Sequence, residues 1–453
     1  MKTINPATGE EIKEYDSMSK EKVEGILSSA SHAFKSWKEK SFDQRAEYLI
    51  KVAKTLREQK AELAKLMAEE MGKPLAQGEG EVEKCAWVCE YYAEHAESFL
   101  EKQKIETDGS KSYITFNPLG TVLAIMPWNF PFWQLFRFAA PALMAGNAAI
   151  LKHSENVTGC ALKIEEIIHE AGIPEDLFRT LVVQVGEVKR IIQHKEIAAV
   201  TLTGSTRAGK AVASQAGEVL KKTVLELGGS DPYIILEDAD IRQAAETCVT
   251  SRLINSGQSC IAAKRFIVME EVYDDFLKEF TSILKEKTIG NPFDEETDIG
   301  PLAREDLRDD LHSQVQDSVL KGAKRYIGGE KPEGEGFYYP LTILTDVKPG
   351  MPAYEEELFG PVASFIKAGS EEEAIHIAND TKYGLGAAIF SADEEKAERI
   401  AAQELEAGCC FVNDFVKSDP RLPFGGIKES GYGRELGLYG IREFVNTKTV
   451  YVK

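Results

Sequence analysis

The first hundred residues carry apolar and charged side chains at the spacing of amphipathic helices. From about Ser19 to Lys104 the apolar positions recur every three or four residues, as they do from Ala46 to Leu56, and charged residues lie between them. A stripe of this period buries one face of a helix and exposes the other. The pattern predicts a helical opening segment.

From Thr121 the pattern changes to short apolar runs separated by amphipathic segments. The runs are typical of buried strands and comprise residues 121–126, 148–151, 181–183 and 199–202. Residues 161–171 and 188–194 have apolar positions at helical spacing. This alternation predicts a parallel sheet covered on both faces. Such sheets bind ligands at the carboxyl ends of their strands, where Asn129, Lys152 and Gly204 fall.

A second set of apolar runs begins at Pro232. It comprises residues 232–236, 265–268, 362–366 and 387–390, with helical patterns at 272–287 and 371–379, and it predicts a second α/β domain. Two alternating segments, 112–116 and 449–452, match neither core. Exposed strands of this kind are either edges that need protection or parts of a sheet shared between subunits, and we favour the second interpretation.

Composition narrows the class of protein. A chain of 453 residues exceeds one hydrophobic core, so two or three domains are expected. The net charge of −20 argues against a nucleic-acid partner, which needs clustered cations. No apolar window reaches the roughly 20 residues of a membrane span, and no signal peptide is evident, so we expect a cytoplasmic protein without a membrane partner. The seven cysteines and seven histidines lack disulfide-framework or metal-ligand spacing, which indicates free thiols and no metal.

One cysteine has the surroundings of a nucleophile. Cys260 follows Asn255-Ser256-Gly257-Gln258-Ser259, a run of small and polar residues, whereas a structural cysteine usually lies in an apolar run. Glu226 ends an apolar strand pattern upstream and could act as the base that a thiol requires. The plainer interpretation makes Glu226 a surface carboxylate at a strand end and Asn129 a turn residue before Pro131.

Eight short motifs resemble those of the aldehyde dehydrogenase superfamily, and they follow that family's order over nearly the full length. They are Pro127-Trp128-Asn129-Phe130-Pro131, Lys152 with Glu155, Thr203-Gly204-Ser205, Glu226-Leu227-Gly228-Gly229, Gly257-Gln258-Ser259-Cys260, Glu357-Leu358-Phe359-Gly360-Pro361, Asn413 and Pro423-Phe424-Gly425-Gly426. The resemblance implies an α/β fold with a Rossmann-like NAD-binding domain (residues 1–105 and 119–227), an α/β catalytic domain (228–435) and a small β extension for oligomerisation (106–118 and 436–453), in a homodimer or homotetramer.

The same resemblance implies the chemistry. In the family, the thiolate that corresponds to Cys260 attacks an aldehyde, hydride passes to the nicotinamide, and water hydrolyses the thioester that remains. The side chain of Asn129 and the backbone N–H of Cys260 correspond to the oxyanion hole. Glu226 corresponds to the general base for the hydrolytic water and is expected to help deprotonate the thiol as well.

Cofactor residues follow by the same correspondence. They are Trp128, Lys152, Glu155, Gly204, Ser205, Leu227, Glu357 and Phe359. The turn at Gly204 suits a pyrophosphate, although it is not a G-x-G-x-x-G loop and by itself is more typical of a structural turn. An anionic Glu155 beside the ribose favours NAD, with NADP less favoured. Residues 182–186 and His153 depart from the pattern of many relatives, so the adenine pocket is expected to differ in detail.

The substrate is expected to be a small aldehyde with a distal carboxylate. Arg137 lies in an apolar helix pattern, and Ser418 and Trp133 join it as candidate substrate contacts, as in succinate-semialdehyde dehydrogenases. The overall pattern is most similar to the short bacterial NAD-dependent members of that group. Their second arginine is replaced here by Ile254, and Arg252 is a candidate substitute. The alternative for Arg137 is a structural ion pair with an acidic neighbour on its helix.

Other functions fit parts of the pattern. Oxidation of another small aldehyde and a dehydrogenase that passes the acyl group to coenzyme A are the main alternatives, although Glu226 favours transfer to water. A simple cysteine hydrolase would work without NAD. A noncatalytic role would tolerate loss of Cys260 or Glu226, and both are present.

Overall fold

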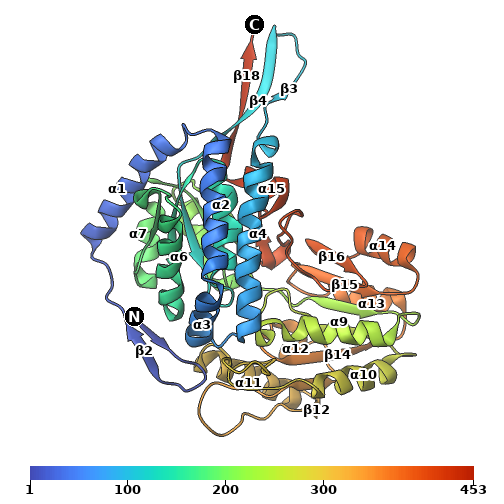
Figure 1. Cartoon of the computed structure of the whole chain (residues 1–453). Coiled ribbons are helices and arrows are strands. Elements are labelled where there is room, and N and C mark those ends of the chain that lie inside the picture. Colours follow the sequence, from blue (N-terminus) through green and yellow to red (C-terminus); the bar gives the residue numbers. More distant parts are fainter.

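The chain folds into two α/β units side by side, and a narrow arm projects from the first (Figure 1). A computed structural model describes residues 1–453. The first unit holds a six-stranded sheet in the order β17-β9-β8-β5-β6-β7. Its strands are β5 (Thr121–Met126), β6 (Ala148–His153), β7 (Phe178–Thr180), β8 (Ile197–Thr203), β9 (Lys222–Glu226) and β17 (Gly431–Tyr432).

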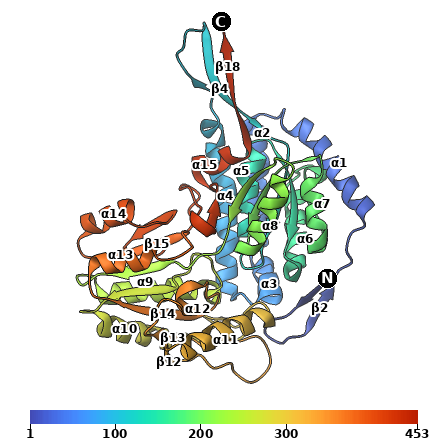
Figure 2. The same ribbon diagram turned by 180° about the vertical axis from the view of Figure 1, so that it is seen from behind.

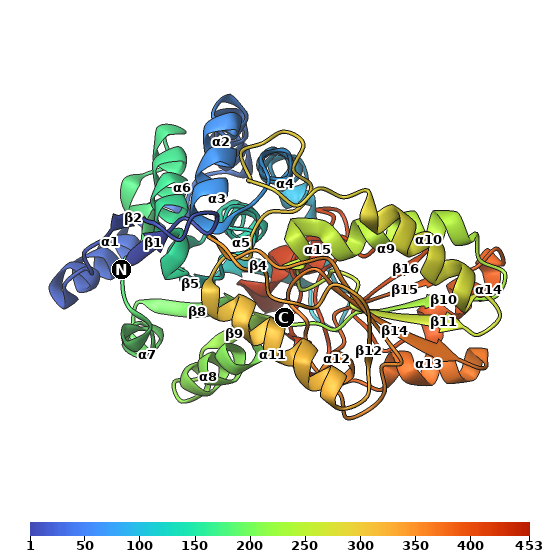
Figure 3. The same cartoon turned by 90° about the horizontal axis from the view of Figure 1, so that it is seen from below.

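Helices cover both faces of this sheet. Figure 3 shows α5 and α6 on one side of the strands and α7 and α8 on the other. These helices are α5 (Trp133–Met144), α6 (Thr158–Glu170), α7 (Val188–Gln193) and α8 (Thr206–Gly217). The central strands β5, β6 and β8 pair in parallel, and almost all of their side chains are buried. Burial from both sides explains why these strands read as continuous apolar runs.

The opening segment is helical, as its pattern predicts. After an N-terminal hairpin, β1 (Lys2–Ile4) and β2 (Glu11–Glu14), it forms α1 (Lys20–Trp37), α2 (Phe42–Glu58), α3 (Lys60–Met71) and α4 (Leu75–Phe99). Ser19 and Ser41 begin the first two helices, because each side chain accepts a hydrogen bond from a backbone N–H of the first turn. The long α4 packs against α2, α3 and α5.

The second unit is built on a seven-stranded sheet in the order β12-β13-β14-β11-β10-β15-β16. Its strands are β10 (Pro232–Ile235), β11 (Arg265–Met269), β12 (Lys324–Ile327), β13 (Thr342–Thr345), β14 (Val362–Ala368), β15 (Gly386–Phe390) and β16 (Cys409–Val412). Its helices are α9 (Ile241–Leu253), α10 (Tyr273–Lys285), α11 (Glu305–Leu320), α12 (Pro352–Glu355), α13 (Glu371–Asn379) and α14 (Glu394–Gln403). Along β10, Ile234 packs in one core and its neighbours Tyr233 and Ile235 in another, so both faces are covered.

The arm contains the two segments that matched neither core. Strand β4 (Lys111–Pro118) pairs antiparallel with β18 (Val445–Val452) along its whole length, and β3 (Gln103–Lys104) adds a short third strand. Figure 2 shows this sheet standing clear of both units. Helix α15 (Gly437–Glu443) precedes β18 and packs on α4 and α5. The extension expected from residue 436 therefore begins as a helix on the first unit, and a role of the arm in oligomerisation stays a prediction.

Most predicted elements agree with the structure, and one strand does not. The run 181–183 was expected to be a strand, but β7 lies three residues earlier, at Phe178–Thr180. Leu181, Val182 and Val183 are buried without being in a strand, because an apolar run indicates burial and does not fix the backbone. None of the helices is both long enough and apolar enough to cross a bilayer.

Candidate active site

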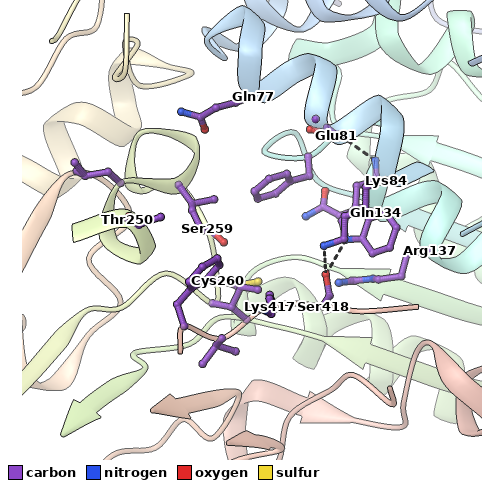
Figure 4. Close-up of a pocket in the computed structure, with 18 of the residues that line it drawn as sticks. Gln77, Glu81, Lys84, Gln134, Arg137, Thr250, Ser259, Cys260, Lys417 and Ser418 are labelled. Carbon is purple, nitrogen blue, oxygen red and sulfur yellow. Dashed lines mark hydrogen bonds between the residues drawn. The ribbon is translucent and has the colours of Figure 1, made fainter. Parts of the chain in front are cut away.

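A cavity of about 460 Å³ lies where both units meet. Its walls come from α4, from α5, from the end of α9 with the loop that follows it, and from residues 415–424 (Figure 4). Cys260 lines this cavity together with Arg137, Trp133 and Ser418. The structure therefore brings the candidate nucleophile and the three candidate substrate residues into one space.

The loop before Cys260 has an unusual backbone. Asn255 and Ser256 have φ of 55° and 57°, and Gly257 has φ of 77°. Left-handed conformations cost free energy for residues with a side chain. At Gly257 a Cβ atom would also lie 2.4 Å from the backbone of Gly360, so the glycine is required twice. This geometry turns the chain sharply and presents Cys260 to the cavity.

Side chains from distant segments hold the loop in this conformation. The amide of Asn255 donates to the carbonyl oxygen of Asn129 at 2.7 Å, and its backbone N–H donates to Gln77 Oε1 at 2.7 Å. Arg252 Nη2 donates to the carbonyl oxygen of Gly257 at 2.6 Å. Hydrogen bonds of this kind offset the backbone strain. The loop of the second unit is thus fixed in part by residues of the first.

Cys260 is half-buried, and its thiol is protonated at rest. Burial raises the pKa of Cys260 to about 12, although the positive charges of Arg137 and Lys264 act in the opposite direction. A nucleophilic thiolate therefore requires a proton acceptor. The backbone N–H of Cys260 donates to no other protein group, so it is available to a ligand.

Asn129 is buried and fixed against the nucleophile loop. Its Nδ2 donates to the carbonyl oxygen of Gln258 at 3.0 Å, and its Oδ1 lies 2.8 Å from Gln134 Nε2. A primary amide carries two N–H donors, and the contact with Gln258 uses one of them. One donor remains for the role in the oxyanion hole that the sequence predicts. The simple turn interpretation does not explain this tight placement.

Glu226 is the last residue of β9 and is 2% exposed, so it is not a surface carboxylate. Burial and the nearby charge of Glu435 raise its pKa well above the usual range, and the charge of Arg137 opposes them. Neither carboxyl oxygen has a hydrogen-bond partner. A Cβ atom at Gly425 would lie 2.6 Å from Glu226 Oε1, so the glycine makes room for the carboxyl group. Glu226 does not line the cavity itself.

Arg137 lines the cavity and is also ion-paired. Its Nε contacts the carboxylate of Glu435, its Nη2 donates to Thr203 Oγ1 at 3.2 Å, and its guanidinium lies over the ring of Phe424. The alternative of an ion pair thus holds in part, but the partner comes from the C-terminal segment and not from the helix. The pair is buried, with both side chains 4% exposed, so much of the charge of Arg137 is compensated.

The suggestion that Arg252 replaces the missing second arginine is wrong. Arg252 is 1% exposed, lies outside the cavity, and is held by the carbonyl oxygen of Gly257. Burial lowers its pKa to about 9. Arg252 is the second-last residue of α9, and its side chain is directed into the protein interior, which the spacing to Cys260 did not reveal. Ile254 does line the cavity, and it is apolar.

Ser418 is the centre of a polar cluster in the cavity. Its Oγ accepts hydrogen bonds from Trp133 Nε1 at 3.2 Å and from Lys84 Nζ at 2.9 Å. Figure 4 shows both contacts and shows Arg137 extending toward the same hydroxyl. The expected residues Ser418 and Trp133 are thus joined by Lys84, which the sequence did not single out.

Two aromatic rings and a carboxylate lie on the other side of the nucleophile loop. Trp128 and Phe359 pack edge to face, with ring centroids 5.7 Å apart. Glu357 accepts a hydrogen bond from the N–H of Gly229 at 3.0 Å and lies 3.8 Å from Lys264 Nζ. Burial raises the pKa of Glu357. A carboxylate beside an apolar wall fits the ribose and ring of a nicotinamide.

The remaining cofactor candidates lie at the carboxyl edge of the first sheet. Lys152 is near the end of β6 and is 5% exposed, and its Nζ makes no hydrogen bond or ion pair with the protein. Glu155 follows it and is half-buried. Ser205 begins α8 and accepts from the N–H of Ala208, which leaves other N–H groups of the first turn for an anion. Donors without partners at this edge fit a dinucleotide.

Leu227 contributes packing at the same edge. It is 5% exposed, and a Cβ atom at Gly209 would lie 2.5 Å from its side chain. The close approach joins α8 to the end of β9. Gly204 has open space around it, with no atom closer than 3.8 Å to the position of an added Cβ. An open glycine turn between a strand and a helix suits a phosphate group.

Three functional candidates were missed from the sequence: Lys84, Glu435 and Lys264. Lys264 Nζ donates to the carbonyl oxygens of Ser259 and Cys260 at 2.9 and 2.8 Å, so it fixes the backbone at the nucleophile. A signal existed only for Lys84, since Gln77, Glu81 and Lys84 recur at helical spacing and all line the cavity. For the other two, the relevant contacts are made across the fold.

Comparisons with known proteins agree with this site. The model of the aldehyde dehydrogenase family matches residues 1–450. The chain is 49% identical to a protein of Synechocystis named probable succinate-semialdehyde dehydrogenase, NADP(+), over 99% of both chains. It is 46% identical to the succinate semialdehyde dehydrogenase, NAD(P)+, of Escherichia coli, over 99% of this chain and 97% of the other.

Solved structures give the same result. The succinic semialdehyde dehydrogenase of Streptococcus pyogenes, crystallised with NADP+, superimposes with a TM-score of 0.97 at 39% identity and covers 100% of this chain and 99% of its own. A structure described in terms of cofactor and substrate selection by Gox0499 has a TM-score of 0.98 at 42% identity, with the same coverage. The expected fold and family are both confirmed.

Proposed function

This chain belongs to the aldehyde dehydrogenase family, and from that premise we propose that it oxidises succinate semialdehyde to the dicarboxylate with NAD as the hydride acceptor. One observation carries the proposal. The half-buried thiol of Cys260 shares a cavity with a cluster of cationic and hydroxyl groups around Ser418. An aldehyde at the sulfur and a carboxylate at this cluster describe a short ω-oxo acid. The names of the relatives support the same substrate.

Residues of this chain can be assigned to the chemical steps of this oxidation. The thiol of Cys260 gives its proton to Glu226, which passes it to solvent, and the sulfur bonds to the aldehyde carbon while the N–H of Cys260 and the amide of Asn129 stabilise the oxygen. A nicotinamide held beside Trp128, Phe359 and Glu357 would supply the hydride acceptor, and the carbon on the Cys260 sulfur would then be left as a thioester. Glu226 removes a proton from the water that cleaves this thioester, and the acid leaves while the thiol is restored. Aldehyde, water and oxidised cofactor thus give the acid, reduced cofactor and protons.

The preference for NAD is proposed from Glu155. A carboxylate at the end of β6 accepts a hydrogen bond from a ribose 2′-hydroxyl and repels a 2′-phosphate. The Synechocystis relative is named for NADP(+) and the Escherichia coli relative for NAD(P)+, so only the first name favours a different cofactor from the residue. The proposal rests on the carboxylate of Glu155, which suits a free 2′-hydroxyl and not a 2′-phosphate.

A panel of aldehydes with each cofactor tests the function. We expect kcat/KM for succinate semialdehyde to exceed that for butanal, which has the same four carbons and no carboxylate, by at least about tenfold, since a paired carboxylate contributes more than 1 kcal/mol. Product formation is expected to need NAD and no coenzyme A. Stimulation by coenzyme A would favour acyl transfer to it instead.

Replacing Glu155 by serine is expected to raise kcat/KM for NADP by roughly tenfold or more and to lower that for NAD, because the substitution removes the repulsion between like charges. Steady-state rates with both cofactors at a fixed aldehyde concentration measure this. Glu187→Ser is the control, because this residue lies on the same unit and is ion-paired with Arg190. An unchanged cofactor ratio in Glu155→Ser would remove the residue from cofactor selection.

A further inference from the structure

The charged groups around the cavity are unevenly compensated. Four cationic side chains line it, and three of them have a carboxylate within 4.0 Å. The compensated pairs are Arg137 with Glu435, Lys287 with Asp298, and Lys417 with Asp414. The fourth cation is Lys84, on α4, and it has no carboxylate within that distance. The uncompensated positive charge of the cavity is therefore on Lys84.

The surroundings of Lys84 orient its ammonium toward Ser418. Lys84 Nζ lies 4.4 Å from the centroid of the Trp133 ring and donates to Ser418 Oγ at 2.9 Å. Trp133 Nε1 donates to the same oxygen, so Ser418 already accepts two hydrogen bonds. Its own hydroxyl proton is then left to donate to a third group. An ammonium with spare N–H donors and a hydroxyl with a free proton together suit a carboxylate.

The carboxylate of Glu81 does not fulfil this need, although it lies one turn earlier on α4. Glu81 is paired with Lys73 and accepts from the backbone N–H groups of Phe132 and Trp133 at 2.9 and 3.0 Å. It thereby caps the N-terminus of α5, and its charge is compensated there. Helix α4 thus carries the carboxylate of Glu81, which is already ion-paired, and one turn later the ammonium of Lys84, which has no carboxylate partner.

We infer that Lys84, together with the hydroxyl of Ser418, is the main anchor for the distal carboxylate of the substrate. The inference rests on the proposed function. Arg137 lies beside the same hydroxyl, but its ion pair with Glu435 leaves it little net charge to offer. Lys84 is therefore the residue that makes the cavity selective for an acid aldehyde.

The inference has a consequence for pH. Burial lowers the pKa of Lys84 to about 8, assisted by the positive charge of Arg137 on α5 and opposed by Cys85 and Glu81 on α4 and by Asp419 of the C-terminal segment. Lys84 is therefore protonated at pH 7, and it loses its charge as the pH rises through about 8. Selectivity for the acid aldehyde is thus expected to be present below pH 8 and to decline above it.

Substitution of Lys84 by methionine tests the inference, because methionine keeps the length of the stem and removes the charge. The quantity measured is the ratio of kcat/KM for succinate semialdehyde to that for butanal. We expect this ratio to fall roughly 10- to 100-fold, the range expected for a hydrogen bond to a charged group. Lys54→Met removes an exposed lysine of α2 that lies outside the cavity, and it is the control, with the ratio expected to stay within about threefold.

Two further measurements distinguish a loss of substrate recognition from a failure of the variant to fold. Turnover of butanal by Lys84→Met shows that the variant is folded and active. In the wild type, the ratio is expected to decrease between pH 7 and pH 9, and in Lys84→Met it is expected to be independent of pH in this range. The wild-type profile requires no variant to fold.

The outcomes separate this inference from the proposed function. If the wild type prefers the acid aldehyde and Lys84→Met keeps that preference, Lys84 is not the anchor, and loss of the preference in Arg137→Leu would assign the role to Arg137. If the wild type itself does not prefer the acid aldehyde, both the substrate class and the role of Lys84 are overturned. Equal losses on both aldehydes in Lys84→Met would show a purely structural role.

Discussion

Replacing Cys260 by alanine is expected to reduce steady-state NADH formation by about 10⁴-fold or more, because no other thiol lines the cavity to form the covalent bond to the aldehyde carbon. The side chain is half-buried at the margin of the core, and alanine removes only its sulfur, so the variant is expected to fold. Binding of NAD, followed by quenching of the protein's tryptophan fluorescence, is expected to be unchanged. The absorbance of NADH measures turnover.

Cys410→Ala is the appropriate control for this loss. Cys410 is also half-buried, but it lies on β16 and does not line the cavity. Full activity is expected in this variant. Appreciable NADH formation by Cys260→Ala would contradict the assignment of the nucleophile and, with it, the thioester route.

Glu226→Gln is expected to lower kcat by roughly 10²- to 10⁴-fold, the contribution usual for a general base. The amide has nearly the same shape as the carboxyl group but cannot accept a proton. If the action of Glu226 on the hydrolytic water limits the rate, the first turnover survives, and a burst of NADH close to the enzyme concentration precedes the slow steady state. Rapid-mixing measurements resolve the burst. A wild-type steady-state rate would exclude Glu226 as the base.

The stability of Glu226→Gln provides an independent check. Because the pKa of Glu226 is raised in the folded protein, the folded state binds more protons than the unfolded state above the ordinary pKa of a glutamate, so its contribution to stability declines as the pH rises. Glutamine has no such dependence. The variant is therefore expected to unfold at a higher temperature than the wild type at pH 8. Glu429→Gln, an exposed acid paired with Lys210, is expected to be neutral in both assays.

The hydrophobic pattern of the sequence predicted those helices and strands whose pattern is set by the burial of that element alone. Strand β5 and helix α13 have the predicted bounds, because burial of a whole strand and of one helix face leaves a direct record in the sequence. The run after Phe178 was misassigned, since buried irregular backbone carries the same apolar residues as a strand. The helix before β18 was missed within a segment that was read only as an extension.

The candidate site was predictable in its residues but not in its charges. Cys260, Arg137 and Ser418 were identified from motifs, and all three line one cavity. The partner of Arg137 is Glu435, nearly three hundred positions later in the chain, and no local pattern relates two such residues. Only the tertiary fold shows that the charge of Arg137 is compensated and that the charge of Lys84 is not. The sequence pattern therefore pointed to Arg137 alone as the residue that recognises the substrate carboxylate.

The left-handed loop before Cys260 also limits how this protein can be divided. The reactive sulfur belongs to the second unit, yet Gln77 and Asn129 of the first unit hold the backbone that presents it. A gene fragment encoding the second unit alone would supply the sulfur without the hydrogen bonds that offset the strain of its loop. The two halves are therefore not interchangeable modules, and recombination between distant homologues should preserve both sides of this junction together.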